Sequence, residues 1–97
     1  LHITLQFIQA IQPADIEKLC KQVEYILTTS PSFDLQLGQL EFFPSPRHPV
    51  VLSLQAGPNE ILANLAMSIS AEMAALNYPA AQELFRGHLT LGRMIHR

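Results

Sequence analysis

Leu1-His2-Ile3-Thr4-Leu5-Gln6-Phe7 and Gly87-His88-Leu89-Thr90-Leu91-Gly92 share one motif, His-x-Thr-Leu, near the two ends of the chain. Both segments alternate apolar and polar residues, which is the pattern of a half-buried β-strand. In each strand the histidine and the threonine lie on the same face, opposite the apolar residues. A His-x-Thr-Leu match arises by chance with odds of roughly 10⁻⁴ per position. Two copies in strand-like segments therefore indicate a functional repeat that chance does not explain. We infer two half-sites that face each other across a cleft.

Between the two motifs the residue pattern predicts two helices and two further strands. Proline suits the first turn of a helix, and apolar residues at helical spacing follow Pro13 and Pro58. Gly38 indicates a bulge within a strand, and a proline-rich loop precedes the next one. The predicted elements are strands over residues 1–7, 33–43, 50–57 and 85–94 and helices over residues 13–29 and 58–77. The order β-α-β-β-α-β predicts an α+β domain, with helices packed on antiparallel sheets.

The apolar stripes of the two predicted helices are expected to form the core. Cys20 lies on the stripe of the first helix, so we interpret it as a packing residue. Met67 and Met73 of the second helix are expected to fill the core as well. In the first strand, Ile3, Leu5 and Phe7 are expected to point inward.

Composition sets limits on the function. The 97 residues, 48% hydrophobic and 14% charged, fit one small globular domain. A net charge of −2 excludes broad electrostatic wrapping of nucleic acid, so an RNA ligand would be held locally, at an end or a single phosphate. The sequence shows no run of ~18 apolar residues, so we expect no membrane association. A lone cysteine, Cys20, favours a reducing compartment, and we expect a cytoplasmic protein.

Two His-Thr pairs suit chemistry on a phosphodiester. At neutral pH one imidazole can be neutral and the other protonated, so the pair can divide the roles of base and acid. Threonine hydroxyls two residues away on the same face can donate hydrogen bonds to the non-bridging phosphoryl oxygens. No carboxylate cluster, cysteine pair or histidine-rich spacing accompanies the motifs, so the sequence favours a mechanism without metal or cofactor.

The order of the motifs resembles the two-histidine (2H) phosphoesterase superfamily. The nearest resemblance is to the LigT-like bacterial RNA 2′,3′-cyclic phosphodiesterases, which are also called 2′-5′ RNA ligases. The resemblance covers essentially the whole chain. It rests on the His-x-Thr-Leu-x-Phe strand, an aromatic-rich strand, a basic proline-containing loop, a Val-Leu strand and the final His-x-Thr-Leu-x-Arg strand, at residues 2–7, 40–43, 44–49, 50–54 and 86–93. Gly87 stands where the family commonly has proline.

The resemblance also implies an architecture. It predicts part of a two-lobed, pseudo-symmetric fold, with residues 1–97 as a single domain that lacks the family's flanking N- and C-terminal elements. The chain starts at Leu1 without a methionine, so we expect a shortened form or a fragment. Strand edges without neighbours favour self-association, and a homo-oligomer is therefore expected.

The implied reaction is hydrolysis of a terminal RNA 2′,3′-cyclic phosphate to a 2′-phosphate, with 2′-5′ RNA ligation as a possible further activity. The resemblance makes His2 the proton donor to the leaving 3′-oxygen and His88 the proton acceptor that activates water. Thr4 and Thr90 would hold the phosphoryl oxygens in the transition state. The implied partners are RNA 3′ ends with a cyclic phosphate, or related small nucleotides, and no cofactor is implied.

Three arginines are candidates for RNA contact. Arg86 and Arg93 flank the second motif, and Arg47 lies in the proline-rich loop. In a regular strand Arg93 lies five residues after His88 and therefore on the opposite face. This spacing predicts that Arg93 points away from the histidine.

Three other functions remain open from the sequence. The chain can be a module that binds nucleotides or RNA ends without turnover, which would tolerate loss of a histidine. It can also be an inactive, truncated domain that self-associates. A zinc site built from His2, His88 and another histidine is a more distant third reading.

Overall fold

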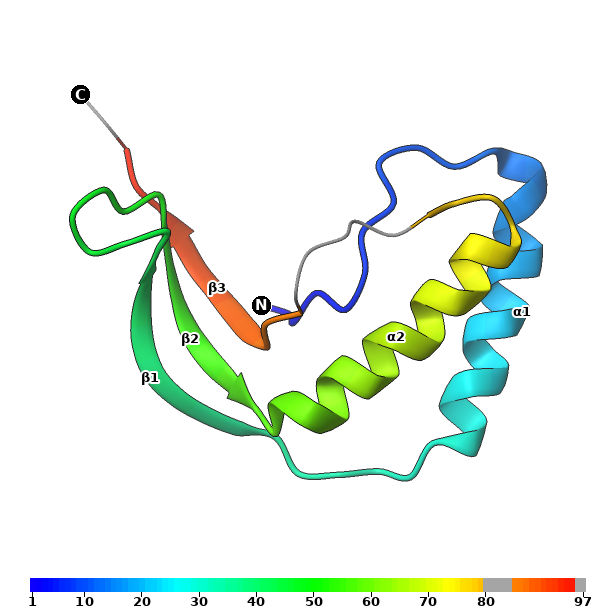
Figure 1. Cartoon of the computed structure of the whole chain (residues 1–97), viewed down its shortest axis with the longest axis horizontal. Helices are drawn as coiled ribbons and strands as arrows, with labels where there is room; N and C mark the ends of the chain where they lie inside the picture. Colours follow the sequence, from blue (N-terminus) through cyan, green and yellow to red (C-terminus); the bar gives the residue numbers. More distant parts are fainter. Residues whose placement is uncertain (80–84, 96–97) are drawn as a thin grey trace.

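A computed structural model describes residues 1–79 and 85–95 of the chain. Within them lie two helices and three strands, and the fold class is α+β, as the sequence predicts. The elements in chain order are α1 (Pro13–Thr29), β1 (Gln36–Phe43), β2 (Val51–Gly57), α2 (Asn59–Ala75) and β3 (His88–Arg93). The two helices lie side by side, and the sheet lies on the other side of α2 from α1, in contact with α2 through β2 (Figure 1).

The three strands form one antiparallel sheet in the order β1-β2-β3. The register between β1 and β2 shifts between Leu37 and Leu40, which confirms the bulge predicted at Gly38. An ideal Cβ at Gly38 would lie 3.0 Å from Oε1 of Gln55, so glycine leaves room for this side chain to cross β1. β1 lies at one edge of the sheet, and β2 is its central strand.

The strand predicted over residues 1–7 is wrong in its extent. The segment forms a single antiparallel bridge, from Ile3 to Leu89 of β3. Beyond the bridge it is held by α2, because the Gln6 side chain donates hydrogen bonds to the Ala66 carbonyl and the Ser70 hydroxyl. Phe7 is 76% exposed and does not point inward as predicted. The two-lobed symmetry that needs this first strand stays a prediction.

The core lies where α2 meets the sheet. Its buried apolar residues are Ala56 on β2 and Leu62, Ala66, Ile69 and Met73 on α2. The α2 members recur at three- and four-residue intervals, so they form one stripe of the helix. The prediction for Met73 is confirmed, since only 2% of this residue is exposed.

Two predicted core residues lie outside this core. Met67 is 67% exposed because it projects from α2 about 100° away from the buried stripe. Cys20 is exposed, and no residue of α1 is buried. Among the described helices and strands, α1 packs against α2 alone, so none of these elements covers the rest of its apolar stripe. The predicted burial of Cys20 is therefore wrong.

The end of α2 is fastened to the start of α1. Asn77, with φ of 68°, turns the chain out of the helix in the left-handed conformation. The Tyr78 hydroxyl donates to Oδ2 of Asp15 at 2.6 Å and accepts the Gln12 N–H at 2.9 Å. The hydrogen bond to the Asp15 carboxylate raises the pKa of Tyr78 above its ordinary value.

Neither described helix combines the length and apolar character that a membrane crossing requires.

Candidate functional site

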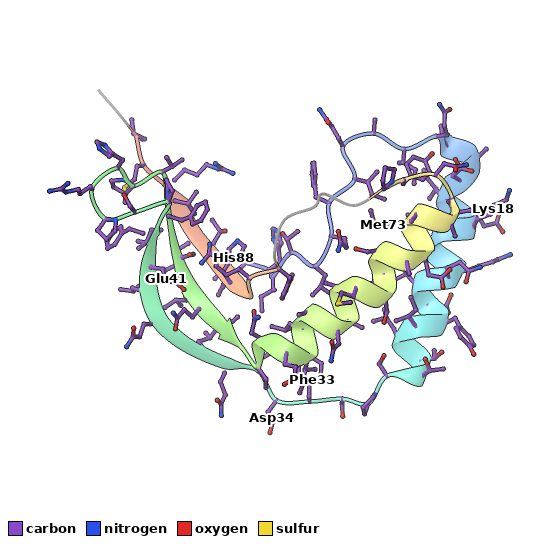
Figure 2. The ribbon with its side chains drawn as sticks, in the orientation of Figure 1. Lys18, Phe33, Asp34, Glu41, Met73 and His88 are labelled. Atoms are coloured by element: carbon purple, nitrogen blue, oxygen red, sulfur yellow. The ribbon has the colours of Figure 1, made fainter. Side chains whose placement is uncertain are left out.

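One face of the sheet collects the polar side chains of the second motif. In β2–β3, Gln55 lies opposite His88 and Ser53 lies opposite Thr90. In β1–β2, Glu41 lies opposite the same Ser53. Directly opposed residues share a face, so all five belong to one surface, which we term the motif face. Figure 2 shows Glu41 on β1 and His88 at the start of β3.

The single bridge between Ile3 and Leu89 sets how the two motifs meet. In an antiparallel pair, the residue after one partner lies beside the residue before the other. The register of the bridge therefore aligns the threonine of each motif with the histidine of the other. Thr4 falls beside His88, and the two bridge residues themselves lie on the opposite, apolar face.

A cleft of about 840 Å³ opens above the motif face. Its polar lining includes Thr4, Arg86, His88, Thr90 and Arg93. Three of the four motif side chains thus meet in one cleft, together with two arginines. Hydroxyl donors, positive charge and an imidazole in one cleft suit the binding of a small anionic group.

His2 lies outside this cleft. It is exposed and lines a neighbouring hollow of about 420 Å³. The two spaces share Thr4, Leu5 and Gln6 as lining residues. His2 therefore lines the adjoining hollow and not the cleft, and the structure does not join both predicted histidines in one cavity.

The ring of His88 is oriented by the backbone just before it. Nδ1 of His88 lies 2.8 Å from the carbonyl oxygen of Arg86. A carbonyl oxygen only accepts, so Nδ1 carries the proton in this hydrogen bond. In the neutral ring the free lone pair is then on Nε2, the nitrogen that remains to accept a proton. The side chain is half-buried, and it lines the cleft.

Arg93 lies on the cleft side of the sheet, and the prediction that it points away is wrong. Val51 pairs with Arg93, whereas Ser53 pairs with Thr90. Two steps along β2 therefore correspond to three along β3, and Leu91 is the extra residue of a β-bulge. One extra residue reverses the alternation of the strand, so Arg93 returns to the face of Thr90.

Arg86 is held in a fixed position at the wall of the cleft. Its Nη1 lies 3.2 Å from Oε2 of Glu41, and its guanidinium carbon lies 4.8 Å from the centroid of the Phe43 ring. Both side chains of the ion pair are about one-third exposed. The sequence analysis did not identify Glu41 and Phe43 as partners of Arg86. Their spacing of two along one strand, which puts them on the same face, was the available signal.

Arg47 takes no part in this arrangement. It is exposed in the loop between β1 and β2, and the described residues that line the cleft do not include it. From this loop the two end residues, Pro44 and Val50, line the cleft.

Gly87 fits between the sheet and the start of α2 because it has no side chain. A Cβ at this position would collide with the carbonyl oxygen of Ala56 and lie 3.1 Å from Cδ1 of Leu62. The Gly87 N–H donates to Oδ1 of Asn59 at 2.7 Å, a hydrogen bond that a proline here would lose. The backbone on either side carries Arg86 and His88, so this close fit positions both side chains.

No metal-binding cluster occurs in the part of the chain that the structure describes. Within residues 1–79 and 85–95, no three histidine, cysteine, aspartate or glutamate side chains gather closely enough to hold a metal ion. The zinc reading therefore gains no support from these residues.

Comparison with known proteins agrees with the motifs. A family model described as the 2′-5′ RNA ligase superfamily matches residues 1–97. An RNA 2′,3′-cyclic phosphodiesterase from Bacillus subtilis (strain 168) is 27% identical over 92 residues. The alignment covers 95% of this chain and 50% of that protein, so the chain spans about half the length of the curated relative it matches.

Proposed function

Because the chain belongs to the 2′-5′ RNA ligase superfamily, we propose that it hydrolyses RNA ends that carry a 2′,3′-cyclic phosphate, leaving a 2′-phosphate. The match to a protein named RNA 2′,3′-cyclic phosphodiesterase supports this substrate class. The observation that carries the proposal is the cleft that joins Thr4, His88 and Thr90, with Nδ1 of His88 directed at the Arg86 carbonyl so that Nε2 is the nitrogen left to act as base. We propose residues 1–97 as one functional domain.

In the proposed reaction, Nε2 of His88 takes a proton from water, and the water oxygen attacks phosphorus. The bond from phosphorus to the 3′-oxygen breaks, and this oxygen receives a proton from His2. The phosphate remains on the 2′-oxygen, so the product is a 2′-phosphate with a free 3′-hydroxyl. General acid and general base catalysis each contribute roughly 10²–10⁴-fold in enzymes.

The negative charge of the transition state is met by residues of the cleft. Thr4 and Thr90 are proposed to donate hydrogen bonds to the two non-bridging oxygens. The Arg93 guanidinium, brought to the same face by the bulge at Leu91, adds a positive charge. Arg86 lines the same cleft and is proposed to contact the RNA backbone.

The proposed role of His2 follows from the register of the bridge. The bridge between Ile3 and Leu89 aligns His2 with Thr90 of β3, just as it aligns Thr4 with His88. The hollow that His2 lines adjoins the cleft at Thr4, and we propose that His2 reaches the leaving oxygen from there. If the 5′-hydroxyl of an RNA replaces water, the same proton transfers form a 2′-5′ linkage, which is the proposed ligase activity.

The test is a reaction of the chain with a short RNA that ends in a 2′,3′-cyclic phosphate. The mixture contains EDTA and spans pH 5 to 8, and the position of the product phosphate is identified by chromatography. We expect a 2′-phosphate and a bell-shaped pH profile, which reports one acid and one base. A 3′-phosphate, or turnover that persists in His88→Ala, would contradict the mechanism. Binding without turnover would favour the non-catalytic RNA-end module.

A second proposal concerns assembly. β1 is an edge strand, and its Leu37 and Leu40 are 56% and 59% exposed. An apolar edge of this kind is a template for pairing with another strand. We expect self-association through β1, to be measured by light scattering after size-exclusion chromatography. A monomer at all concentrations would contradict this proposal.

A further inference from the structure

A second hollow, of about 490 Å³, lies against the motif face beside the cleft. We propose that it binds the nucleobase of the nucleotide that precedes the cyclic-phosphate end of the RNA. The inference rests on the proposed function and deepens it, because it assigns a substrate length. Its volume is within the range of about 300–1,000 Å³ that small-molecule sites occupy.

The two spaces adjoin at Arg86. Among the described residues, Arg86 is the only one that lines both the cleft and the hollow. The sheet register makes the same connection, since His88 lines the cleft and Gln55, directly opposite on β2, lines the hollow. A ligand that occupies both spaces therefore passes Arg86. In an RNA the group at this point is the phosphodiester that joins the last two nucleotides, and the guanidinium matches its charge.

The lining of the hollow suits a base better than a second phosphate. Three carboxamides line it, from Gln36, Gln55 and Asn59. Carboxamides supply both a donor and an acceptor, and they pair with the edges of unstacked bases. The charges present, from Glu41 and Arg86, already form an ion pair with each other. The remaining recognition is therefore by neutral hydrogen bonds.

Two of these carboxamides lie against glycines. Oδ1 of Asn59 accepts the Gly87 N–H, which leaves the amide N–H groups of Asn59 as donors. The Gln55 side chain lies over Gly38, where a Cβ would stand 3.0 Å from its Oε1. Gln55 is exposed, so its polar end needs no internal partner and remains available to a ligand.

The expected consequence is a preference for RNA ends of at least two nucleotides over mononucleotides. The probes are a diadenosine dinucleotide that ends in a 2′-phosphate and adenosine 2′-monophosphate, both products and therefore resistant to turnover. Calorimetry with the whole chain measures the ratio of the two dissociation constants. We expect the dinucleotide to bind roughly fivefold more tightly, the effect of one net hydrogen bond. Gln55→Ala should bring the ratio close to one.

Gln39→Ala is the matched control, since Gln39 is an exposed carboxamide on β1 that does not line the hollow. It should leave the ratio unchanged, whereas Gln36→Ala should lower it. Equal affinity of the two probes for the wild type, or an unchanged ratio in both Gln55→Ala and Gln36→Ala, would overturn the subsite. Hydrolysis of adenosine 2′,3′-cyclic phosphate is measured in parallel. If it is absent while the Gln55-dependent preference persists, the proposed function fails and the subsite stands.

Discussion

The Arg86 side chain reaches from the segment before β3 to Glu41 on β1, where Nη1 lies 3.2 Å from Oε2. β2 lies between these two strands, so the side chain crosses the central strand of the sheet. Phe43, two residues beyond Glu41, supports the guanidinium from one side. An otherwise flexible cation is thereby oriented between the cleft and the second hollow. The pair acts by holding Arg86 in place more than by stabilising the fold, since exposed ion pairs add little to stability.

Glu41→Gln tests this orienting role. The substitution keeps the shape of the side chain and removes the charge that anchors Arg86. We expect KM for the RNA substrate to rise roughly twofold to fivefold, in line with partly exposed ion pairs, with kcat nearly unchanged. Glu24→Gln, an exposed glutamate on α1, is the control and should leave KM unaltered. A fall in kcat with unchanged KM would contradict an orienting role.

His88→Ala should lower kcat by roughly 10²–10⁴-fold, because it removes the proposed base. The fold should persist, since His88 lies at the cleft surface and is only half-buried. His48→Ala, in the exposed loop between β1 and β2, is the matched histidine control. Rates come from product analysis and folding from circular dichroism. Equal turnover in the two variants would rule out His88 as the base.

Arg93→Ala tests the consequence of the β-bulge. Since the extra residue Leu91 turns Arg93 to the cleft, its loss should reduce kcat/KM roughly tenfold or more, the effect of a hydrogen bond to a charged group. Arg47→Ala removes the same charge from an exposed loop residue outside the cleft lining and should have little effect. If the two variants lose activity equally, the arginines act through net charge alone and the bulge has no special role.

Gly87→Ala tests the close fit beside the motif. The added Cβ would meet the Ala56 carbonyl oxygen, which belongs to the backbone and cannot turn aside. We expect a loss of about 1–3 kcal/mol in the free energy of unfolding, typical of overpacking, measured by urea denaturation. Gly92→Ala is the control, since a Cβ at Gly92 would meet no atom of the described residues within 4 Å, its chain neighbours aside. A Gly87→Ala protein as stable as Gly92→Ala would show that the backbone adjusts freely.

The sequence predicted the elements well where local pattern determines them. Helix α1 has the predicted bounds, and the bulge at Gly38 was indicated by the residue itself. The bulge in β3 was missed because Leu91 is an ordinary strand residue. Only the pairing with β2 shows that one residue is extra, and that pairing decides the direction of Arg93.

Burial was predicted less well, for a related physical reason. A periodic apolar stripe shows which side of a helix can be covered, while coverage depends on a partner surface. The stripe of α2 has the sheet as a partner and buries Met73, whereas that of α1 leaves Cys20 exposed. In the same way, Gln6 binds α2 and ends the strand that residues 1–7 were predicted to form. Long-range hydrogen bonds of this kind leave no local pattern.

Tyr78→Phe tests the connection between the two helices and its dependence on pH. The phenol donates to Asp15 and accepts from the Gln12 N–H, so phenylalanine loses both hydrogen bonds. We expect a lower melting temperature than that of the wild type at pH 8. Tyr25→Phe is the control, since Tyr25 is 68% exposed and its hydroxyl joins no hydrogen bond among the described residues.

The pH dependence has a definite sign. Because the Asp15 carboxylate raises the pKa of Tyr78, the folded state retains the phenolic proton at pH values where the unfolded chain releases it. The contribution of Tyr78 to stability is therefore fully present below about pH 10, the ordinary tyrosine value, and is lost as pH rises through the folded pKa. The difference in melting temperature between wild type and Tyr78→Phe should shrink above pH 10. A difference that stays constant or grows there would show that the proton on Tyr78 does not hold α1 and α2 together.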